Sequence, residues 1–262
     1  MSKQIELNYS VVIPTHDRID FLENAIRSVF QQSILPSEII VVDDLGLSKV
    51  SNLLENLTNE FDFEIKYVVS NSKNGVSHSY NLGASKARGD YLAFLDDDDF
   101  WSKDYMINVG KIIFEKNVDI VLTRLTAFDE ESQLTSPGKC PPQKFDVNTF
   151  YIKNPGVLRS NLVLKRSCFE LANGYDEKIL GSSDKELFMR LKALNKKHYV
   201  MDQHNMVYWR TNHKSQASSN HKRMLGNVKN FYKKYFFSIP LVVHFKMIIK
   251  ILRLFYFSYR NK

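Results

Sequence analysis

The chain has 262 residues, of which 44% are apolar and 13% aromatic, with 36 Lys or Arg, 29 Asp or Glu and two cysteines. This composition fits one large α/β domain or two small ones, and it excludes a disordered, collagen-like or disulfide-stapled chain. Cys140 and Cys168 lack CxxC spacing, so we expect free thiols, either in a reducing compartment or simply packed. Residues 1–9 contain no apolar run of the kind that a secretory signal needs, so we expect the protein in the cytosol.

The formal net charge of +7 is unevenly distributed along the chain. Residues 203–262 contain 12 Lys or Arg and no acid, whereas residues 1–202 contain all 29 acids and 24 Lys or Arg. The protein therefore has an acidic body and a basic tail. A basic segment of this kind can meet nucleic acid, anionic lipid or an acidic partner, and charge alone does not choose among them.

Within the body, short apolar runs alternate with helical patterns. Residues 9–14 (YSVVIP) favour a buried strand, and residues 17–32 place apolar side chains at helical spacing, with Asp17 as the predicted N-cap. The alternation continues to residue 95 and implies a parallel sheet with helices on both faces. The further predicted strands are 38–43, 63–69 and 91–95, and the further predicted helices are 48–59 and 76–87.

Four consecutive carboxylates, at residues 96–99, directly follow the apolar run YLAFL. Such crowding is electrostatically costly unless a cation or hydrogen-bond donors compensate it. Mg²⁺ or Mn²⁺ takes oxygen ligands and bridges to substrate phosphates, so a divalent ion is one explanation. The other is a solvated acidic turn that caps the next helix, with Asp99 or Ser102 as N-cap.

A second acidic pair favours the metal explanation. Asp43 and Asp44 end another predicted strand, and ligands of parallel sheets lie beyond the carboxyl ends of the strands. Carboxylates there can accept hydrogen bonds from ribose hydroxyls or a base N–H, and nearby helix N-termini favour phosphate, so we expect a nucleotide with a metal. The loops that should converge on one crevice are 15–18, 43–46, 71–75 and 96–99.

The sequence contains, in order, SVVIPTHDR (10–18), EIIVVDD (38–44) and NGVSHSYNLGASKARGDYLAFLDDDD (74–99). Together these three segments resemble the nucleotide-binding half of family 2 glycosyltransferases of the GT-A fold. A fourth segment, GYDEKILGSSDKELFMRL (174–191), is similar to the acceptor-side segment in which a Gly-Phe-Asp stretch precedes a Glu-Asp pair. The resemblance covers roughly residues 9–215.

The resemblance implies a fold class and a domain organisation. The fold would be α/β of the GT-A type, a Rossmann-like, mostly parallel sheet flanked by helices, with a C-terminal helical tail. Residues 1–100 would form the nucleotide-sugar-binding half of one GT-A domain, and residues 101–220 would form its acceptor-binding half. Residues 221–262 would form a basic amphipathic helical tail.

The resemblance also assigns a donor site. Asp44 would meet the base, Asp96 the ribose, and Asp98 the diphosphate and a Mn²⁺ or Mg²⁺ cofactor, while Asp43 would support its loop. His213 stands where related enzymes often have a His near the metal, although a lone His is as often a surface or packing residue. The implied metal ligands are Asp98 and His213, and the implied donor-binding residues are Pro14, Thr15, Arg18, Asp44, Asn74, Asp96, Asp97 and Asp98.

On the acceptor side, Asp184 aligns with the Asp of the Glu-Asp pair, the general base that deprotonates the acceptor hydroxyl in an inverting transfer. The alternative is that Asp184 only caps a helix at residues 185–194. Ser183 stands where the Glu usually does, and residues 154–160 are expected to border the same site. The predicted acceptor-binding residues are Trp101, which either stacks on a sugar or anchors the core, and Gly181, Ser182 and Ser183.

The basic tail has a long apolar stretch at residues 239–259, but cationic residues and His244 interrupt it, which argues against a transmembrane helix. Lys246, Lys250 and Arg253 fall at i, i+4 and i+7, with Arg260 seven residues further, so they would form one basic stripe. This pattern is typical of an interfacial helix on an anionic membrane. The alternative is a helix packed on the body or on a second subunit in a homodimer. Nucleic acid is not expected, because the body is acidic and its motifs have a better explanation.

The resulting hypothesis is a metal-dependent inverting glycosyltransferase that moves a sugar from a nucleotide diphosphate sugar, UDP-sugar by default, to a hydroxyl of a glycan or lipid-linked glycan. We expect a place in bacterial surface polysaccharide biosynthesis, with the protein peripheral at the inner face of the cell membrane. The alternative hypothesis, which Ser183 favours, is a non-catalytic nucleotide-sugar-binding partner subunit.

Overall fold

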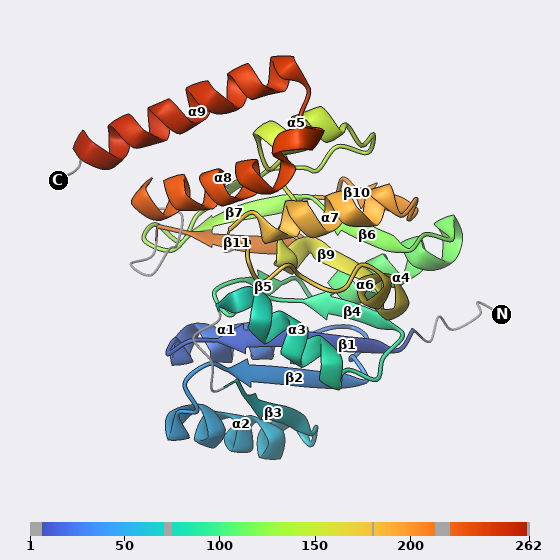
Figure 1. Cartoon of the computed structure of the whole chain (residues 1–262). Coiled ribbons are helices and arrows are strands. Elements are labelled where there is room, and N and C mark those ends of the chain that lie inside the picture. The colour runs from blue at the N-terminus through green and yellow to red at the C-terminus, as the bar shows by residue number, and fades with distance from the viewer. Residues whose placement is uncertain (1–6, 71–74, 180, 213–220, 261–262) are drawn as a thin grey trace.

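The central element of the computed structural model is a seven-stranded sheet, and the structure describes residues 7–70, 75–179, 181–212 and 221–260. The strand order is β10-β6-β9-β4-β1-β2-β3, and β1 pairs in parallel with both β2 and β4 (Figure 1). Only β9 runs antiparallel to its neighbours in this sheet. The strands are β1 (Tyr9–Thr15), β2 (Glu38–Asp43), β3 (Ile65–Val69), β4 (Tyr91–Phe94), β6 (Ile120–Thr123), β9 (Leu162–Lys165) and β10 (His198–Met201).

Helices cover both faces of this sheet. Val11 and Ile13 point into one core and Val12 into the other, because successive side chains of a strand alternate between faces. Buried residues of α1 (Ile19–Phe30), α2 (Ser48–Phe61) and α4 (Tyr105–Lys116) join the first core. Those of α3 (Val76–Lys86), α6 (Arg166–Leu171) and α7 (Ser183–Ala193) join the second. The predicted mostly parallel sheet with helices on both faces is confirmed.

A smaller sheet follows the acidic run and was not predicted. Its strand order is β5-β11-β7-β8, with β11 beside β5 and β7 although it comes last in the chain. The strands are β5 (Phe100–Trp101), β7 (Leu125–Asp129), β8 (Thr135–Pro137) and β11 (Val207–Thr211), and the short helix α5 (Val147–Ile152) follows β8. This sheet brings β11 to the carboxyl end of β4, where the acidic residues lie.

Three local expectations have clear outcomes. Asp17 does not cap α1, because the N-cap is Arg18 and Asp17 has a left-handed φ of 59° with its carboxylate paired to Lys49. Cys140 and Cys168 are both free, as predicted. The acidic run also does not cap the next helix, since the N-cap of α4 is Asp104.

The tail forms two helices, α8 (His221–Tyr235) and α9 (Leu241–Arg260). Val243 and Met247 of α9 are buried, and Lys250 is turned inward, where its Nζ donates to the carbonyl oxygen of Ile152 at 2.6 Å. The predicted single outward basic stripe is therefore wrong at Lys250, because the last carbonyls of α5 need donors. Lys246 and Arg253 are exposed.

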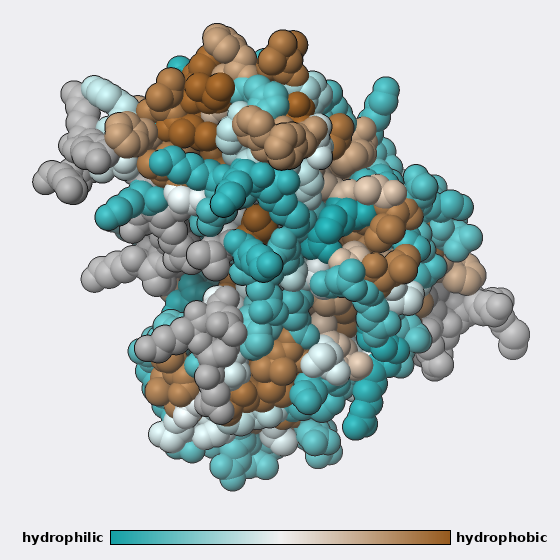
Figure 2. Space-filling model, in the orientation of Figure 1, coloured by the Kyte–Doolittle hydropathy of each residue, from teal (hydrophilic) through white to brown (hydrophobic). Residues whose placement is uncertain are grey.

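Large apolar side chains of α9 face outward instead. Phe245 is 68% exposed and Leu252 is 61% exposed, and Figure 2 shows brown side chains gathered over this helix. Among the described residues, no helix is both long enough and apolar enough to cross a bilayer.

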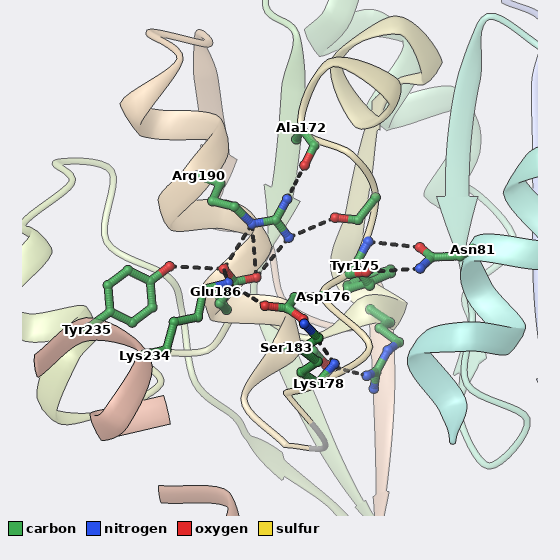
Figure 3. Close-up of polar contacts among 12 residues, drawn as sticks. Asn81, Ala172, Tyr175, Asp176, Lys178, Ser183, Glu186, Arg190, Lys234 and Tyr235 are labelled. Atoms are coloured by element: carbon green, nitrogen blue, oxygen red, sulfur yellow. Dashed lines mark hydrogen bonds and ion pairs between the residues drawn. The ribbon is translucent and has the colours of Figure 1, made fainter. Parts of the chain in front are cut away.

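A buried carboxylate joins α8 to α7. Glu186 is fully buried and accepts hydrogen bonds from Arg190 of its own helix and from Lys234 and Tyr235 of α8 (Figure 3). Burial would raise the pKa of Glu186, but the hydrogen bonds from Arg190 and Lys234 outweigh it, so the pKa lies below its ordinary value. The first half of the tail is thus held to the helix that carries Asp184.

Candidate active site

The predicted convergence of loops is seen where β1, β2 and β4 end. Thr15, at the end of β1, donates its hydroxyl to Asp97 at 2.8 Å, and Tyr80 of α3 donates to Asp96 at 2.8 Å. Ser79 of the same helix donates to Asp44, which follows β2. The pairing of β1 with β2 and β4 explains this meeting, because neighbouring parallel strands end at the same edge. Asn74, in the fourth predicted loop, lies outside the described residues.

The carboxylate of Asp43 stabilises the loop after β2. The carboxylate of Asp43 accepts hydrogen bonds from the backbone N–H groups of Leu45 and Leu47 at 2.9 and 2.8 Å, and from the Tyr67 hydroxyl at 2.9 Å. The predicted supporting part of Asp43 is therefore confirmed. Asp44 is left beside it as the acid that faces Ser79 and His16.

Arg18 binds two of the four consecutive acids. Its guanidinium pairs with Asp97 and lies 2.6 Å from Asp98. Asp97 is almost fully buried, and burial, opposed by Arg18, raises its pKa to about 7. Thr15 and Arg18 thus occupy the oxygens of Asp97, so a direct donor contact for Asp97 stays a prediction.

Asp99 binds the smaller sheet. Its two oxygens accept hydrogen bonds from the Ser160 hydroxyl and from the backbone N–H of Arg210 in β11. The Arg210 side chain in turn donates to the carbonyl oxygen of Asp98 at 2.8 Å. Burial raises the pKa of Asp99 well above its ordinary range, and Asp98 and Asp96 raise it further. Asp99 therefore braces the acidic turn.

The remaining acids fit a divalent cation. Asp96, Asp98 and Asp99 each offer an oxygen, and these atoms lie within 4.8 Å of one another. Because protein donors already occupy both oxygens of Asp99, Asp96 and Asp98 are the residues that would hold the ion. Hard ions such as Mg²⁺ and Mn²⁺ prefer this all-oxygen donor set. The second predicted ligand, His213, lies outside the described residues.

Asp184 lies in the first turn of α7, and an arginine connects it to the acidic turn. Arg159 Nε is 3.3 Å from Asp184 Oδ1, and another guanidinium nitrogen is 3.9 Å from Asp96. The guanidinium carbon lies 5.0 and 5.4 Å from the ring centres of Tyr80 and Tyr175. The alternative in which Asp184 caps the helix is wrong, because the N-cap of α7 is Ser182.

The environment of Asp184 suits a proton acceptor. The side chain is 6% exposed, and burial, opposed by Arg159, raises its pKa to about 6. In the described part of the chain, Asp184 Oδ1 accepts no hydrogen bond of good geometry. Arg159 Nε faces this oxygen without completing a hydrogen bond of good geometry, so the oxygen can still accept one from a substrate hydroxyl.

Residue-level reasoning missed the part played by Arg159. The expectation that residues 154–160 border the acceptor site rested on their turn-forming composition, and nothing in it singled out the arginine. Arg159 also donates to the Ser183 hydroxyl at 2.6 Å, so it binds two consecutive residues of α7. The sequence did contain one indication, because a single arginine in a turn near a predicted acidic site is a candidate partner for its carboxylates.

Trp101 is not an acceptor-stacking residue. It is 3% exposed, its ring packs against Tyr105, and its indole N–H donates to the carbonyl oxygen of Ser160 at 2.7 Å. The core-anchoring interpretation is confirmed, because no ring face is left for a sugar. Gly181, by contrast, lies where an added side chain would meet Asn227 of α8.

Solved structures share this fold. TarS 1-349 of Staphylococcus aureus, in complex with UDP-GlcNAc, matches with a TM-score of 0.66 and 17% identity over 97% of this chain and 74% of its own. The mannosyltransferase PcManGT of Pyrobaculum calidifontis, in complex with GDP-Man and Mn²⁺, matches with a TM-score of 0.66 and 15% identity over 88% of this chain and 64% of its own. At such identities the likeness shows the fold, which is the GT-A fold of glycosyltransferases.

The sequence comparisons identify the family. The model of glycosyl transferase family 2 matches residues 10–171, and the chain belongs to this family. The putative teichuronic acid biosynthesis glycosyltransferase TuaG of Bacillus subtilis is 31% identical over 119 residues, 45% of this chain and 44% of its own. The GalNAc(5)-diNAcBac-PP-undecaprenol beta-1,3-glucosyltransferase of Campylobacter jejuni is 40% identical over 91 residues, 34% of this chain and 29% of its own. The chain thus spans less than half the length of these relatives.

Proposed function

We propose that this protein is an inverting glycosyltransferase that moves a sugar from a nucleotide diphosphate sugar to a hydroxyl of a glycan or lipid-linked glycan. The observation that carries the proposal is the Asp184 carboxylate, which is buried, accepts no hydrogen bond of good geometry at Oδ1 from the described residues, and is joined through Arg159 to Asp96. Such a transfer needs a carboxylate that can hold a metal ion near the leaving diphosphate, here at the strand end, and a base for the acceptor hydroxyl, here on the facing helix.

The donor would lie over the acidic turn. Asp44 is available to a base N–H, Asp96 to the ribose, and Arg18 to the diphosphate. Asp98, with Asp96 beside it, would hold Mn²⁺ or Mg²⁺, which when bound supplies compensation for the charge that develops on the leaving diphosphate. We take UDP-sugar as the default donor, and the UDP-GlcNAc complex of TarS supports this choice.

The acceptor hydroxyl would donate its hydrogen bond to Asp184 Oδ1. As the hydroxyl oxygen attacks the sugar carbon and the bond from that carbon to the diphosphate oxygen breaks, the proton passes to Asp184. With a pKa of about 6, the carboxylate is ionised at neutral pH and remains basic enough to take the proton. Arg159 holds the carboxylate in place throughout.

The test is Asp184→Asn, which keeps the shape of the side chain and removes its basicity. Transfer should fall about 10²- to 10⁴-fold, the usual contribution of a general base. Binding of UDP with Mn²⁺, measured by calorimetry, should persist. Asp20→Asn on the exposed start of α1 is the matched control, and retained transfer in Asp184→Asn would refute the assignment.

The alternative hypothesis of a non-catalytic nucleotide-sugar-binding subunit has no remaining support from Ser183. It rested on Ser183 replacing a Glu, yet Ser183 is buried and accepts a hydrogen bond from Arg159 while Asp184 keeps its place beside it. Donor hydrolysis by the wild-type protein distinguishes the two possibilities, since a binding subunit would leave the nucleotide sugar intact.

We further infer an acceptor in bacterial surface glycan biosynthesis and a cytosolic enzyme at the inner face of the membrane. The names of the TuaG and undecaprenol-linked relatives support the first inference. The exposed apolar side chains of α9, with Lys246 and Arg253 beside them, support the second. Flotation with anionic vesicles should recover the full chain but not Phe245→Ser/Leu252→Ser. Equal recovery would refute the membrane site, and a dimer in solution would assign the same face to a second copy.

A further inference from the structure

A cavity of about 660 Å³ lies apart from the acidic turn, between the end of α5, the start of α7 and the two tail helices. Figure 1 shows these four helices gathered above the sheet. Four lysines line the cavity from separate segments of the chain, and none of the described lining residues is Asp or Glu. These lysines, called the lysine pocket below, are Lys139, Lys153, Lys185 and Lys250.

Two of these lysines are held close together by the fold. Lys185 is 3% exposed and donates to the carbonyl oxygens of Phe150 and Tyr151 at 2.8 and 3.5 Å. Lys250 donates to Ile152, the next carbonyl of the same helix. These bonds satisfy the carboxyl end of α5. Two of the three ammonium donors of Lys185 are used, and its Nζ also lies 3.7 Å from the ring centre of Phe231. Lys250 uses one donor, so it keeps donors for the cavity.

The positive charges of the lysine pocket are not compensated by the protein. None of the four lysines forms an ion pair with a carboxylate in the described ranges of the chain. Burial, and next the nearby Lys250, lower the pKa of Lys185 to about 7, and burial followed by Lys139 lowers that of Lys250. Converging cations of this kind repel one another unless an anion joins them.

The lysine pocket adjoins the proposed base. Ser182 and Lys185 line the cavity, and Asp184, which lies between them in the sequence, pairs with Arg159 instead. Asn227 of α8 lines it from the other side and packs against Gly181. The cavity therefore borders the first turn of α7, which also carries Asp184.

We propose that the lysine pocket binds the diphosphate group of a lipid-linked acceptor. This rests on the proposed function, in which the acceptor is a lipid-linked glycan. A diphosphate offers several anionic oxygens, each of which can accept a charge-assisted hydrogen bond from an ammonium group. The helix that supplies Lys250 also exposes Phe245, Ile248 and Leu252, an apolar surface suited to the lipid.

Calorimetry with inorganic pyrophosphate tests the pocket directly, without donor sugar or transfer, so that a failure of the proposed function does not affect it. EDTA is added to remove divalent ions, because without a metal the carboxylates of the acidic turn repel the diphosphate. Lys139→Gln/Lys153→Gln changes two exposed side chains and should weaken binding about tenfold or more, because each ammonium group would contribute a charge-assisted hydrogen bond to the diphosphate. Lys139→Arg/Lys153→Arg should keep most of the affinity.

The matched control is Lys229→Gln/Lys233→Gln, which removes the same charge from exposed positions of α8 outside the cavity. Equal weakening in both double variants, or no binding by the wild type, would overturn the proposal.

A second measurement identifies the source of the diphosphate. Phosphatidylcholine vesicles carrying a polyprenyl diphosphate should bind the wild-type chain more tightly than vesicles carrying the uncharged polyprenol, and Lys139→Gln/Lys153→Gln should remove the difference. Equal binding to the two kinds of vesicle would refute the lipid diphosphate as the ligand, even where free pyrophosphate binds.

Discussion

The acidic turn at residues 96–99 and the lysine pocket handle crowded charge in opposite ways. Arg18 pairs with Asp97 and Asp98, and Arg159 faces Asp96, so that the protein itself supplies cations to the turn. The lysine pocket has no such partners among the described residues. Planar guanidinium groups hold carboxylates in a defined geometry, whereas ammonium groups adapt to a mobile anion. Under the proposed function, the acidic turn would be a preorganised donor and base region, and the lysine pocket would be an acceptor region completed by its ligand.

Among the variants that test this contrast, the largest expected effect comes from breaking the compensation at Arg159. Arg159→Gln should lower kcat about a hundredfold or more, the typical loss for one preorganised donor, because Asp184 and Asp96 then repel one another without a cation between them. The control is Arg88→Gln, at an exposed position. Arg159→Lys should be intermediate. A kcat that is unchanged in Arg159→Gln would mean that the arginine does not act on the base.

Glu186 provides the next test, because it is a carboxylate compensated by Arg190 of its own helix and by Lys234 of the tail. Removing one partner of a buried ion pair costs about 3–5 kcal/mol, so Glu186→Gln should lower the free energy of unfolding by an amount near that range. Chemical denaturation measures it, with the exposed Glu55→Gln as control. In the wild type this contribution is present above the unfolded-state pKa and is lost as pH falls through the lowered folded-state pKa. If the free energy of unfolding did not change in Glu186→Gln and did not fall at acidic pH, the proposed role of Glu186 would be contradicted.

The pH profile of transfer sharpens the account of Asp184. Protonation below its pKa of about 6 removes the base, so kcat/KM should fall about tenfold for each further pH unit. Because Arg159 lowers the pKa of Asp184, this acidic limb should move to higher pH in Arg159→Gln. A limb that does not move would show that Arg159 acts only on stability.

The smallest expected effect concerns Trp101. Trp101→Phe removes the bond from the indole N–H to Ser160 and should cost about 1 kcal/mol of stability. Because the ring is buried, the KM for the acceptor should not change. A raised acceptor KM with unchanged stability would restore the sugar-stacking interpretation.

Much of the fold of the first hundred residues could be predicted from the residues alone. The apolar runs that become β1, β2 and β4 are continuous and β-branched, and parallel pairing of neighbours brings their carboxyl ends together, which places Thr15, Asp44 and Asp96 at one edge. The smaller sheet escaped prediction because β5 and β8 span only two and three residues and because β11 joins β5 and β7 from far along the chain. Periodicity over two or three residues carries no signal.

The sequence by itself determined the order of strands and helices in the first hundred residues, the acidic turn, and the uneven charge of body and tail, because these depend on local pattern and composition. Only the tertiary structure decided which charges meet. Arg159 reaches Asp96 and Asp184 across long separations in the chain, and Lys250 turns inward to a carbonyl of α5 rather than outward with Lys246. Such partners are chosen by packing, since a buried polar group must find whatever donor the fold places beside it.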